Sequence, residues 1–248
     1  LLSPMFAPTG SPALAWRDAA RARLAHEQFD LLVIGGGITG AGVARDAALR
    51  GLRVALVERD DFASGTSSRS SRLVHGGVRY LEYGFLHLVF EASRERRILL
   101  DRAPSLVHPL QFTWPVYRGE RVPRWKLGIG LWLYDLLALF RNVAPHHRLS
   151  RERVLATEPL LSREGLQGGA TYFDARLTLA VVADAVRAGA AAINHAAAFA
   201  LLDDAGRIAG ARVRDQLSGN VVDVRASLVV NATGPWTDAM RHLEDPSA

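Results

Sequence analysis

The chain has 248 residues, of which 49% are hydrophobic and 22% are charged, a balance typical of a folded globular protein rather than a disordered one. It contains no cysteine, which excludes disulfide bonds, thiolate metal sites and a cysteine-linked flavin. The formal net charge is +5, and Lys126 is the one lysine among 30 lysines and arginines. This basic excess therefore indicates coding bias more than a nucleic-acid-binding surface.

Residues 1–27 are expected to form an N-terminal extension. They lack the continuous apolar core of a secretory signal, residues 16–27 predict a short helix, and the natural start is expected at Met5. The longest apolar run covers residues 127–140, which is shorter than the ~20 residues that a membrane-spanning helix needs. The sequence therefore predicts no transmembrane segment.

The first regular elements form a βαβ unit. Residues 29–34 are a short apolar run that ends in glycines, residues 38–50 have the pattern of an amphipathic helix, and residues 53–57 read as a second buried strand. A strand, a glycine turn, a helix and a strand within ~30 residues predict a parallel sheet with a right-handed crossover. The fold class is therefore predicted to be α/β.

The next segments leave this pattern. Residues 61–80 are rich in Ser and Gly and predict a loop. A helix is predicted over residues 85–102, with apolar positions at Leu86, Val89, Phe90, Ile98 and Leu99. Residues 110–117 become β-like among several prolines, which predicts that the chain leaves the first sheet near residue 108.

The second half predicts a return to the sheet. A strand is expected at residues 172–174, a helix at 175–188 and a short strand at 191–195. Two further strands flank a turn at residues 203–206, and a last strand at 227–230 runs into a glycine-containing junction.

The glycine turn after the first strand carries the strongest motif. Gly35, Gly37 and Gly40 match the G-x-G-x-x-G pattern between a strand and a helix, where glycines allow a tight turn, close approach of a pyrophosphate and close packing of helix on strand. Glu58 ends the second strand ~20 residues later, where a carboxylate accepts hydrogen bonds from a ribose hydroxyl. The predicted dinucleotide-binding residues of this motif are Gly35, Gly36, Gly37, Ile38, Thr39, Gly40 and Glu58.

Two further features favour FAD over NAD. A Ser/Gly loop intrudes directly after the second strand, where an NAD-dependent dehydrogenase continues with another βαβ unit, and its Thr66, Ser67 and Ser68 can donate hydrogen bonds to a phosphate or a ribityl chain. A solvated loop explains these residues equally well. The late strand also ends in a junction that resembles the second dinucleotide contact of flavoproteins, at Ala232, Thr233 and Gly234.

Four stretches carry a resemblance to a known family. They are IGGGITGAGVARDAALRGL (34–52), TSSRSSRLVHGGVRYLE (66–82), FDARL (173–177) and VNATGPW (230–236). The chain resembles, over about residues 28–240, the FAD-dependent, membrane-associated glycerol-3-phosphate dehydrogenases and the related glycerophosphate oxidases. The second stretch is the most specific, because the first and last occur across a wider superfamily of flavoproteins that oxidise amines and hydroxyacids.

The resemblance implies roles for the serine-rich segment. In the family this loop wraps the flavin, which implies cofactor contacts by Ser71, Arg72, Leu73 and His75, with Arg72 at a position where relatives often have lysine. The family also has an arginine and a tyrosine in the glycerophosphate pocket, and these correspond to Arg79 and Tyr80.

His75 and Arg79 each have a second interpretation. An imidazole near neutrality can accept the proton of an alcohol during hydride transfer, so His75 is the predicted catalytic base; it can also merely hydrogen-bond flavin or backbone. Arg79 offers a fork for a phosphate, or an exposed ion pair. The histidines show no metal-ligand spacing, since His146 and His147 have no carboxylate cluster nearby, and no metal is expected.

The implied activity is oxidation of sn-glycerol 3-phosphate to dihydroxyacetone phosphate with FAD, and transfer of the electrons to membrane quinone. The alternatives are a glycerophosphate oxidase, another amine or hydroxyacid oxidase, or an inactive flavin-binding fragment. The protein is expected in the cytoplasm, bound peripherally to the inner face of the cytoplasmic membrane. No nucleic-acid partner is expected, and the sequence leaves open whether the protein forms a homodimer.

One segment is a candidate for that membrane contact. Cations at Arg121, Arg124 and Lys126 precede the apolar run 127–140 with its aromatic residues, an order that suits phosphate headgroups beside an apolar interface. A buried helix explains the same run equally well.

The predicted fold is a Rossmann-like, two-dinucleotide-binding FAD domain interleaved with a partly missing, β-rich substrate domain. Because the resemblance implies that family members continue for about as long again, the chain by itself is expected not to turn over glycerol 3-phosphate. The predicted domain bounds are 1–27 for the extension, 28–108 and 174–238 for the FAD domain, 109–173 for the first part of the substrate domain and 239–248 for the start of its remainder.

Overall fold

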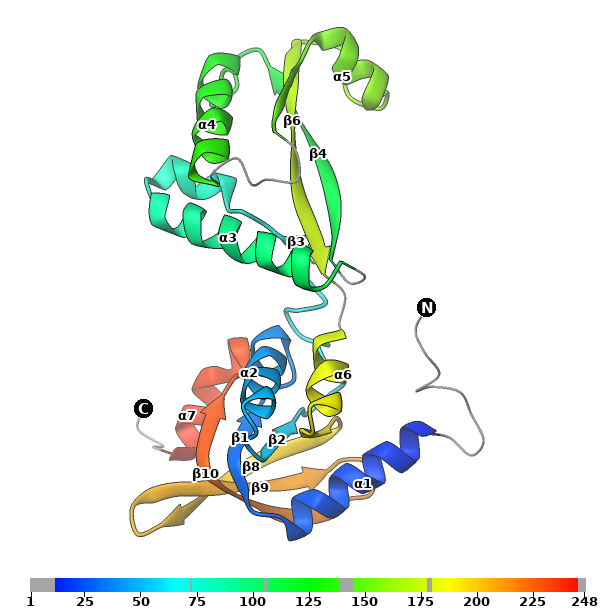
Figure 1. Cartoon of the computed structure of the whole chain (residues 1–248), viewed down its shortest axis with the longest axis vertical. Coiled ribbons are helices and arrows are strands. Elements are labelled where there is room, and N and C mark those ends of the chain that lie inside the picture. Colours follow the sequence, from blue (N-terminus) through cyan, green and yellow to red (C-terminus); the bar gives the residue numbers. More distant parts are fainter. Residues whose placement is uncertain (1–11, 72, 105–106, 139–144, 178–179, 245–248) are drawn as a thin grey trace. The chain divides into compact units, whose positions relative to one another are not determined.

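The computed structural model describes residues 12–71, 73–104, 107–138, 145–177 and 180–244, and for residues 12–15, 79, 173–177 and 180 it describes the backbone alone. The chain forms two compact units, one from Leu1–Ser71 with Leu179–Ala248 and the other from Arg72–Thr178 (Figure 1). None of the helices in the described ranges is long and apolar enough to cross a membrane.

The first unit is built on a six-stranded sheet in the order β7-β2-β1-β10-β9-β8. The strands β7, β2, β1 and β10 are parallel, and β9 and β8 continue the sheet as an antiparallel hairpin. The elements are α1 (Pro12–His26), β1 (Phe29–Ile34), α2 (Ile38–Leu49), β2 (Val54–Val57), α6 (Ala180–Arg187), β7 (Ala191–Ile193), β8 (Ala196–Asp204), β9 (Arg207–Asp215), β10 (Val221–Asn231), η2 (Gly234–Trp236) and α7 (Thr237–Glu244).

Helices cover both faces of the central strands, which explains why these strands read as continuous apolar runs. Leu31 and Val33 of β1 point to the core beneath α2 and α6, whereas Leu32 and Ile34 point to the core shared with α1. Figure 1 shows α2 and α6 side by side, and α1 apart from them. The predicted βαβ unit, the hairpin about residues 203–206 and the parallel α/β sheet are confirmed.

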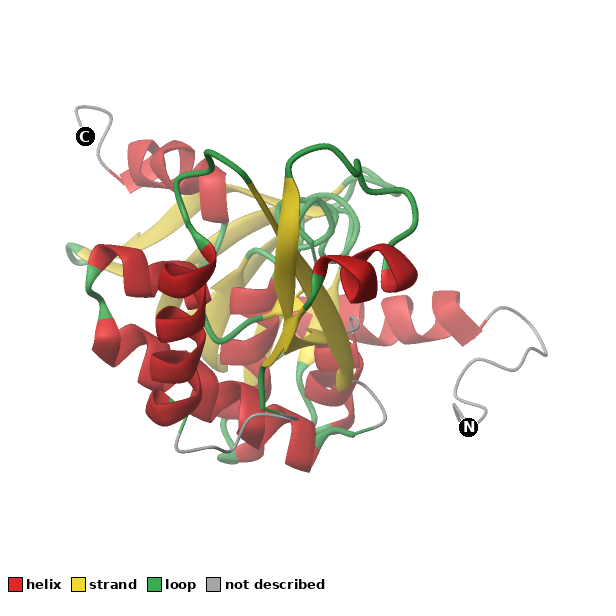
Figure 2. Cartoon of the chain, turned by 90° about the horizontal axis from the view of Figure 1, so that it is seen from above, coloured by secondary structure: helices red, strands yellow, loops and turns green. Residues whose placement is uncertain are grey.

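The second unit is a four-stranded antiparallel sheet in which β6 pairs with β3, β4 and β5. Figures 1 and 2 show α3 and α4 on one side of the long β4–β6 ribbon and α5 at the other. The elements are β3 (Leu73–Val74), η1 (Val78–Tyr83), α3 (Leu86–Arg102), β4 (Val107–Tyr117), α4 (Arg124–Leu137), β5 (His147–Leu149), α5 (Arg151–Thr157) and β6 (Leu166–Leu177).

The compact units divide the chain elsewhere than the predicted domains. The predicted exit from the first sheet near residue 108 lies inside the second unit, because β3 already pairs with β6 through Leu73 and Val74. The predicted return strand at 172–174 is likewise part of β6 and belongs to the second sheet. The helix predicted over 175–188 is shorter, since residues 175–177 continue β6 and α6 is Ala180–Arg187.

Helix α3 buries a different face from the predicted one. Of the predicted apolar positions, Leu86, Phe90 and Ile98 are exposed, and Val89 is buried. The other buried residues of this helix are Ser93 and Arg96. Apolar periodicity therefore located the helix and missed its polar contact surface.

Candidate dinucleotide-binding site

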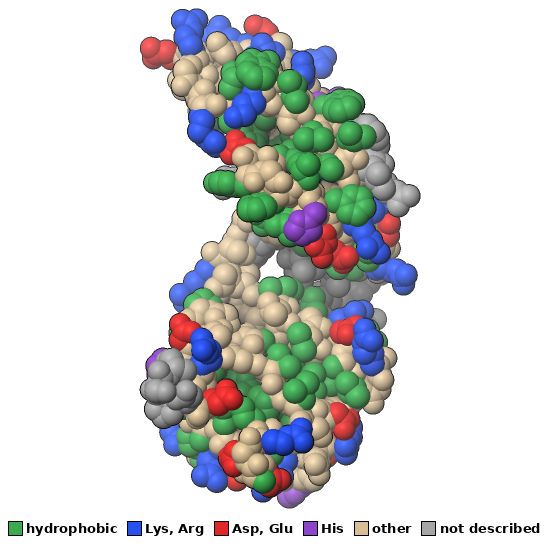
Figure 3. All heavy atoms as spheres, turned by 90° about the vertical axis from the view of Figure 1, so that its left-hand side faces the viewer, with side chains coloured by type: hydrophobic (Ala, Val, Ile, Leu, Met, Phe, Trp, Pro, Cys, Tyr) green, Lys and Arg blue, Asp and Glu red, His purple; other side chains and the backbone are tan. Residues whose placement is uncertain are grey.

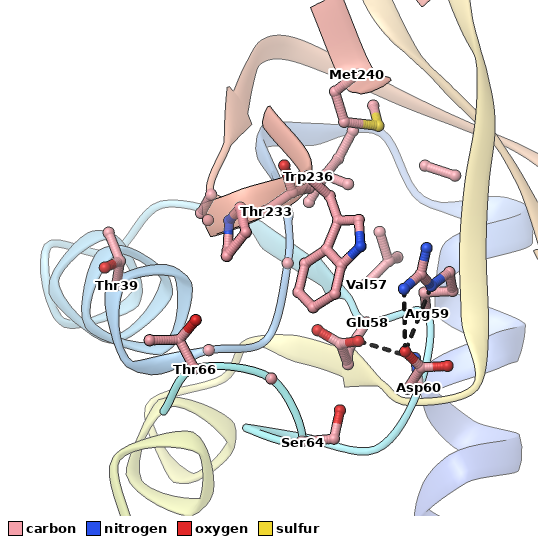
Figure 4. A pocket seen from close by; sticks show the side chains of 18 of the residues that line it. Thr39, Val57, Glu58, Arg59, Asp60, Ser64, Thr66, Thr233, Trp236 and Met240 are labelled. Atoms are coloured by element: carbon pink, nitrogen blue, oxygen red, sulfur yellow. Dashed lines mark hydrogen bonds and ion pairs between the residues drawn. The ribbon is translucent and has the colours of Figure 1, made fainter. Parts of the chain in front are cut away.

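A pocket of ≈ 570 Å³ opens in the first unit at the edge where β1, β2 and β10 end (Figure 4). Its volume lies within the range of ~300–1,000 Å³ that is usual for ligand sites. Parallel strands bring their carboxyl ends to one edge, and this edge is where α/β proteins bind nucleotides. The predicted residues that line the pocket are Gly35, Gly37, Ile38, Thr39, Glu58, Thr66, Ser67, Ala232, Thr233 and Gly234.

The glycine turn is required by close backbone contacts. Gly35 has φ +109°, and a Cβ there would lie 2.5 Å from the carbonyl oxygen of Ala232. A Cβ on Gly40 would lie 1.8 Å from the carbonyl oxygen of Gly35. Each distance is too short for a real side chain, so β1, β10 and α2 can meet only where these residues are glycine.

Gly36 has different surroundings from Gly35 and Gly40, because side chains rather than backbone atoms lie closest to it. A Cβ there would lie 2.6 Å from Phe62 and 2.8 Å from Cβ of Glu58, and Gly36 is absent from the pocket lining. Gly36 therefore packs under the loop after β2, a contact with Phe62 that the sequence pattern does not indicate, and its predicted contact with the cofactor stays a prediction.

The N-terminus of α2 faces the pocket. Its N-cap residue, Gly37, has extended backbone and supplies no side-chain cap, so the amide groups of the first turn lack their usual partners. One of them is bonded from outside the helix, because the Ile38 amide donates to Ser67 Oγ at 2.9 Å. The serine-rich loop is therefore fastened to the helix end at which a phosphate would bind.

Glu58 holds the turn together from the end of β2. Its Oε2 accepts a hydrogen bond from the Gly36 amide at 2.7 Å, and its Oε1 accepts one from the Asp60 amide at 2.8 Å. Figure 4 shows the carboxylate at the wall of the pocket. Each carboxylate oxygen can accept a second hydrogen bond, so a ribose hydroxyl can still bind.

Some pocket residues were not predicted as site residues. The Arg59 guanidinium lies 5.2 Å from the ring centroid of Trp236, and a Cβ on Gly65 would lie 3.1 Å from the same indole. Trp236 and Met240 line the pocket from η2 and α7. Trp236 belongs to the stretch VNATGPW, so a signal for it was present; Met240 had none.

The remaining residues of the serine-rich segment are divided between the units. Ser68 and Ser71 do not line the pocket, and Arg72 lies outside the described residues. Leu73 and His75 belong to the second unit, so their predicted flavin contacts stay predictions.

The predicted catalytic and substrate residues lie together in the second unit. His75 is exposed on a turn, and its ring centroid is 6.2 Å from that of Tyr80, edge to face. Arg79 is on η1 between them in the sequence, and only its backbone is described. The turn therefore presents an imidazole and a phenol side by side.

The residues of the first unit fit the FAD nucleotide. The turn leaves no Cβ between backbone and pocket, the helix end presents amide groups, and a carboxylate stands at the end of β2. These features define the class of dinucleotide-binding α/β proteins.

A model of the family described as FAD dependent oxidoreductase matches residues 30–247. The chain belongs to this family.

Curated relatives narrow the likeness. The chain is 47% identical over 219 residues to "Glycerol-3-phosphate dehydrogenase" of Synechocystis sp., a match that covers 85% of the chain and 40% of the relative. It is 45% identical to "Glycerol-3-phosphate dehydrogenase, mitochondrial" of Homo sapiens, which covers 89% of the chain and 33% of the relative. The chain thus spans about two-fifths or less of the length of these relatives.

Solved structures agree. The glycerol-3-phosphate dehydrogenase of Bacillus halodurans complexed with FAD is 34% identical, with a TM-score of 0.71 over 92% of this chain and 39% of that one. The glycine oxidase of Bacillus cereus is 22% identical with a TM-score of 0.60, and covers 86% of this chain and 58% of that one. The second similarity shows the fold alone.

Proposed function

We propose that the chain binds FAD in the first unit and takes part in the oxidation of sn-glycerol 3-phosphate to dihydroxyacetone phosphate. One observation carries the proposal: the turn with His75 and Tyr80 accompanies a dinucleotide pocket in a chain 47% identical to a protein named glycerol-3-phosphate dehydrogenase. The first unit is then the FAD domain, and the second is part of the substrate domain.

The first unit binds the nucleotide through separate groups. Glu58 accepts hydrogen bonds from the ribose, in addition to the two amides that it already holds. The amides at the start of α2 receive the pyrophosphate beside Gly37, and Thr66 and Ser67 extend these contacts along the loop. Bound FAD supplies the acceptor for the hydride that leaves C2 of the substrate.

The second unit prepares the substrate for that transfer. An imidazole nitrogen of His75 takes the proton of the C2 hydroxyl and so acts as the general base. Tyr80 stands beside it and hydrogen-bonds the substrate, and Arg79 binds the phosphate, for which a guanidinium is suited.

This division of roles predicts two different kinetic defects. Arg79→Ala should mainly weaken substrate binding, because the phosphate is remote from the reacting carbon, whereas His75→Ala should mainly slow flavin reduction, by roughly 10²–10⁴-fold for a lost base. Stopped-flow measurement of flavin reduction at several substrate concentrations separates the binding defect from the rate defect. The measurement is made on the full-length protein. Equal effects of both substitutions on binding and rate would contradict the division.

The fate of the electrons separates the proposed dehydrogenase from an oxidase. We propose that a membrane quinone takes the electrons. A relative from Staphylococcus haemolyticus, 40% identical, is named "Aerobic glycerol-3-phosphate dehydrogenase", and this name is consistent with the proposal. Reoxidation of the reduced protein should be faster with a soluble quinone analogue than with oxygen. The reverse order would favour a glycerophosphate oxidase, and no flavin reduction at all would favour an inactive flavin-binding protein.

A contact with the inner face of the cytoplasmic membrane is proposed for α4. One side of this helix is buried through Leu127 and Leu131. Its other side exposes large apolar residues at helical spacing, and Figure 3 shows hydrophobic side chains gathered on this face of the second unit. The exposed set is Trp125, Ile129, Trp132 and Leu136, with exposed fractions of 66%, 59%, 56% and 40%.

A further inference from the structure

A buried polar pair lies against the turn that carries His75. Arg96 of α3 and Tyr134 of α4 are each 1% exposed, and Arg96 Nη1 donates a hydrogen bond to Tyr134 Oη at 2.6 Å. The guanidinium carbon also lies 5.6 Å from the centroid of the Tyr134 ring. The pair thus joins the two helices in the interior of the second unit.

The Tyr134 hydroxyl presses on the backbone of Gly76. A Cβ on Gly76 would lie 2.0 Å from Tyr134 Oη and 2.8 Å from Ser93 Oγ, and real side chains do not approach so closely. Gly76 and Gly77 are buried, whereas His75 beside them is exposed. The two helices therefore supply a polar floor on which the turn rests.

The same turn fixes Tyr80. Gly77 has φ +71°, and a Cβ there would lie 2.3 Å from Cδ2 of Tyr80. The Tyr80 amide donates to the carbonyl oxygen of Gly77 at 2.8 Å. Because His75 adjoins Gly76, whose backbone lies against Tyr134, and Tyr80 packs on the next residue, Gly77, a shift of that backbone moves both side chains.

A buried guanidinium is a costly way to join two helices. Apolar side chains of similar volume often stabilise an interior as well or better, whereas a charge-assisted hydrogen bond fixes one geometry. Arg96 and Tyr134 thus suit a contact in which the position of the turn matters more than stability. We propose that they are positioning residues that hold the His75–Gly76–Gly77 turn, and with it His75 and Tyr80, in the arrangement used for substrate. This inference rests on the proposed function.

Tyr134→Phe removes the hydroxyl and keeps the ring, so this substitution is the main test. It is made in the FAD-loaded, full-length protein. Hydrogen exchange of the amides of residues 75–80, measured without substrate, should accelerate about tenfold or more. Flavin reduction by saturating glycerol 3-phosphate should slow roughly 10- to 100-fold, the size expected for a displaced catalytic group, while FAD content stays at the wild-type level. Arg96→Met should give the same pattern, and Arg96→Lys should restore part of it.

Val154→Ala is the matched control for general destabilisation. Val154 is fully buried in a different cluster of the second unit, with Leu149 and Leu166. This variant should lower the melting temperature and leave exchange at residues 75–80 and the reduction rate within about twofold of wild type.

Wild-type exchange at residues 75–80 in Tyr134→Phe, or an equal acceleration in Val154→Ala, would overturn the positioning role. Failure of the wild-type protein to reduce its flavin with glycerol 3-phosphate would instead refute the proposed function. In that event the exchange measurement alone decides the inference, because it needs no substrate.

Discussion

Gly40 is the residue at which the site tolerates least change. The position that a Cβ would occupy on Gly40 is 1.8 Å from the carbonyl oxygen of Gly35, whereas a Cβ on Gly42, two residues further along the same helix, would have nothing within 4 Å. The two glycines therefore differ in surroundings and share a helix, which makes them a matched pair.

Gly40→Ala should destabilise the protein by ~1–3 kcal/mol, because α2 must move away from the turn, and FAD should be lost on gel filtration. Gly42→Ala should keep FAD and gain up to ~1 kcal/mol, since alanine is the better helix former. Urea unfolding and flavin absorbance measure both effects. Equal FAD retention by the two variants would contradict the role given to the Gly35–Gly40 contact.

Among the elements, α1 is fastened to the sheet by a buried ion pair. Arg17 donates to both carboxylate oxygens of Asp215 at 2.8 Å and to the carbonyl oxygen of Asn194 at 2.9 Å. The hydrogen bonds from Arg17, supported by the amides of Leu217 and Ser218, hold the pKa of Asp215 well below its usual range. The helix that precedes β1 is thus packed as part of the first unit.

Arg17→Met should cost about 3 kcal/mol at pH 7, since it leaves a buried carboxylate without its main partner. Because the folded pKa is lowered, the contribution of the pair is complete above the unfolded pKa of ~3.9 and is lost as the pH falls through the folded value. Urea midpoints of wild type and variant should therefore differ most at neutral pH and approach each other progressively as the pH falls below ~4 toward the lowered folded value. A difference that stays constant with pH would show that the ion pair is not its source.

The exposed face of α4 predicts binding to anionic lipid. Ile129→Asp with Trp132→Asp should abolish flotation with liposomes, whereas Leu217→Asp, at an exposed apolar residue of the first unit, should leave it unchanged. Charge reversal of Arg124 or Lys126 should weaken binding by ~1 kcal/mol each, and reversal of Arg121 by less, because Arg121 is already paired with Glu82 at 2.7 Å. Flotation that ignores all of these substitutions would exclude α4 as the membrane surface.

For the whole molecule, sequence reasoning was most successful where local chemistry sets the structure. The glycine turn, the βαβ unit and the Glu58 position follow from short-range patterns, and each lies where it was predicted. The boundary near residue 108 was misplaced because a strand of two residues, β3, decides it through long-range pairing with β6. No local pattern reveals such a pairing.

The buried polar contacts were also beyond the sequence. Arg17 and Arg96 are two of many arginines, and nothing in their neighbourhoods distinguishes them from exposed ones. Their burial depends on partners that are remote in the chain, Asp215 and Tyr134. The periodicity of apolar residues does not identify the buried face of a helix such as α3, because some of the buried residues on that face are polar.

The protein is proposed to bind FAD and to act on glycerol 3-phosphate rather than on an amine or a hydroxyacid. The most direct test of this substrate choice is the flavin absorbance of the FAD-loaded, full-length protein, recorded after anaerobic addition of each substrate. Glycerol 3-phosphate should bleach the flavin within seconds, while glycerol, glycine, proline and lactate should leave it oxidised. Bleaching by an amino acid or a hydroxyacid, with glycerol 3-phosphate inert, would contradict it.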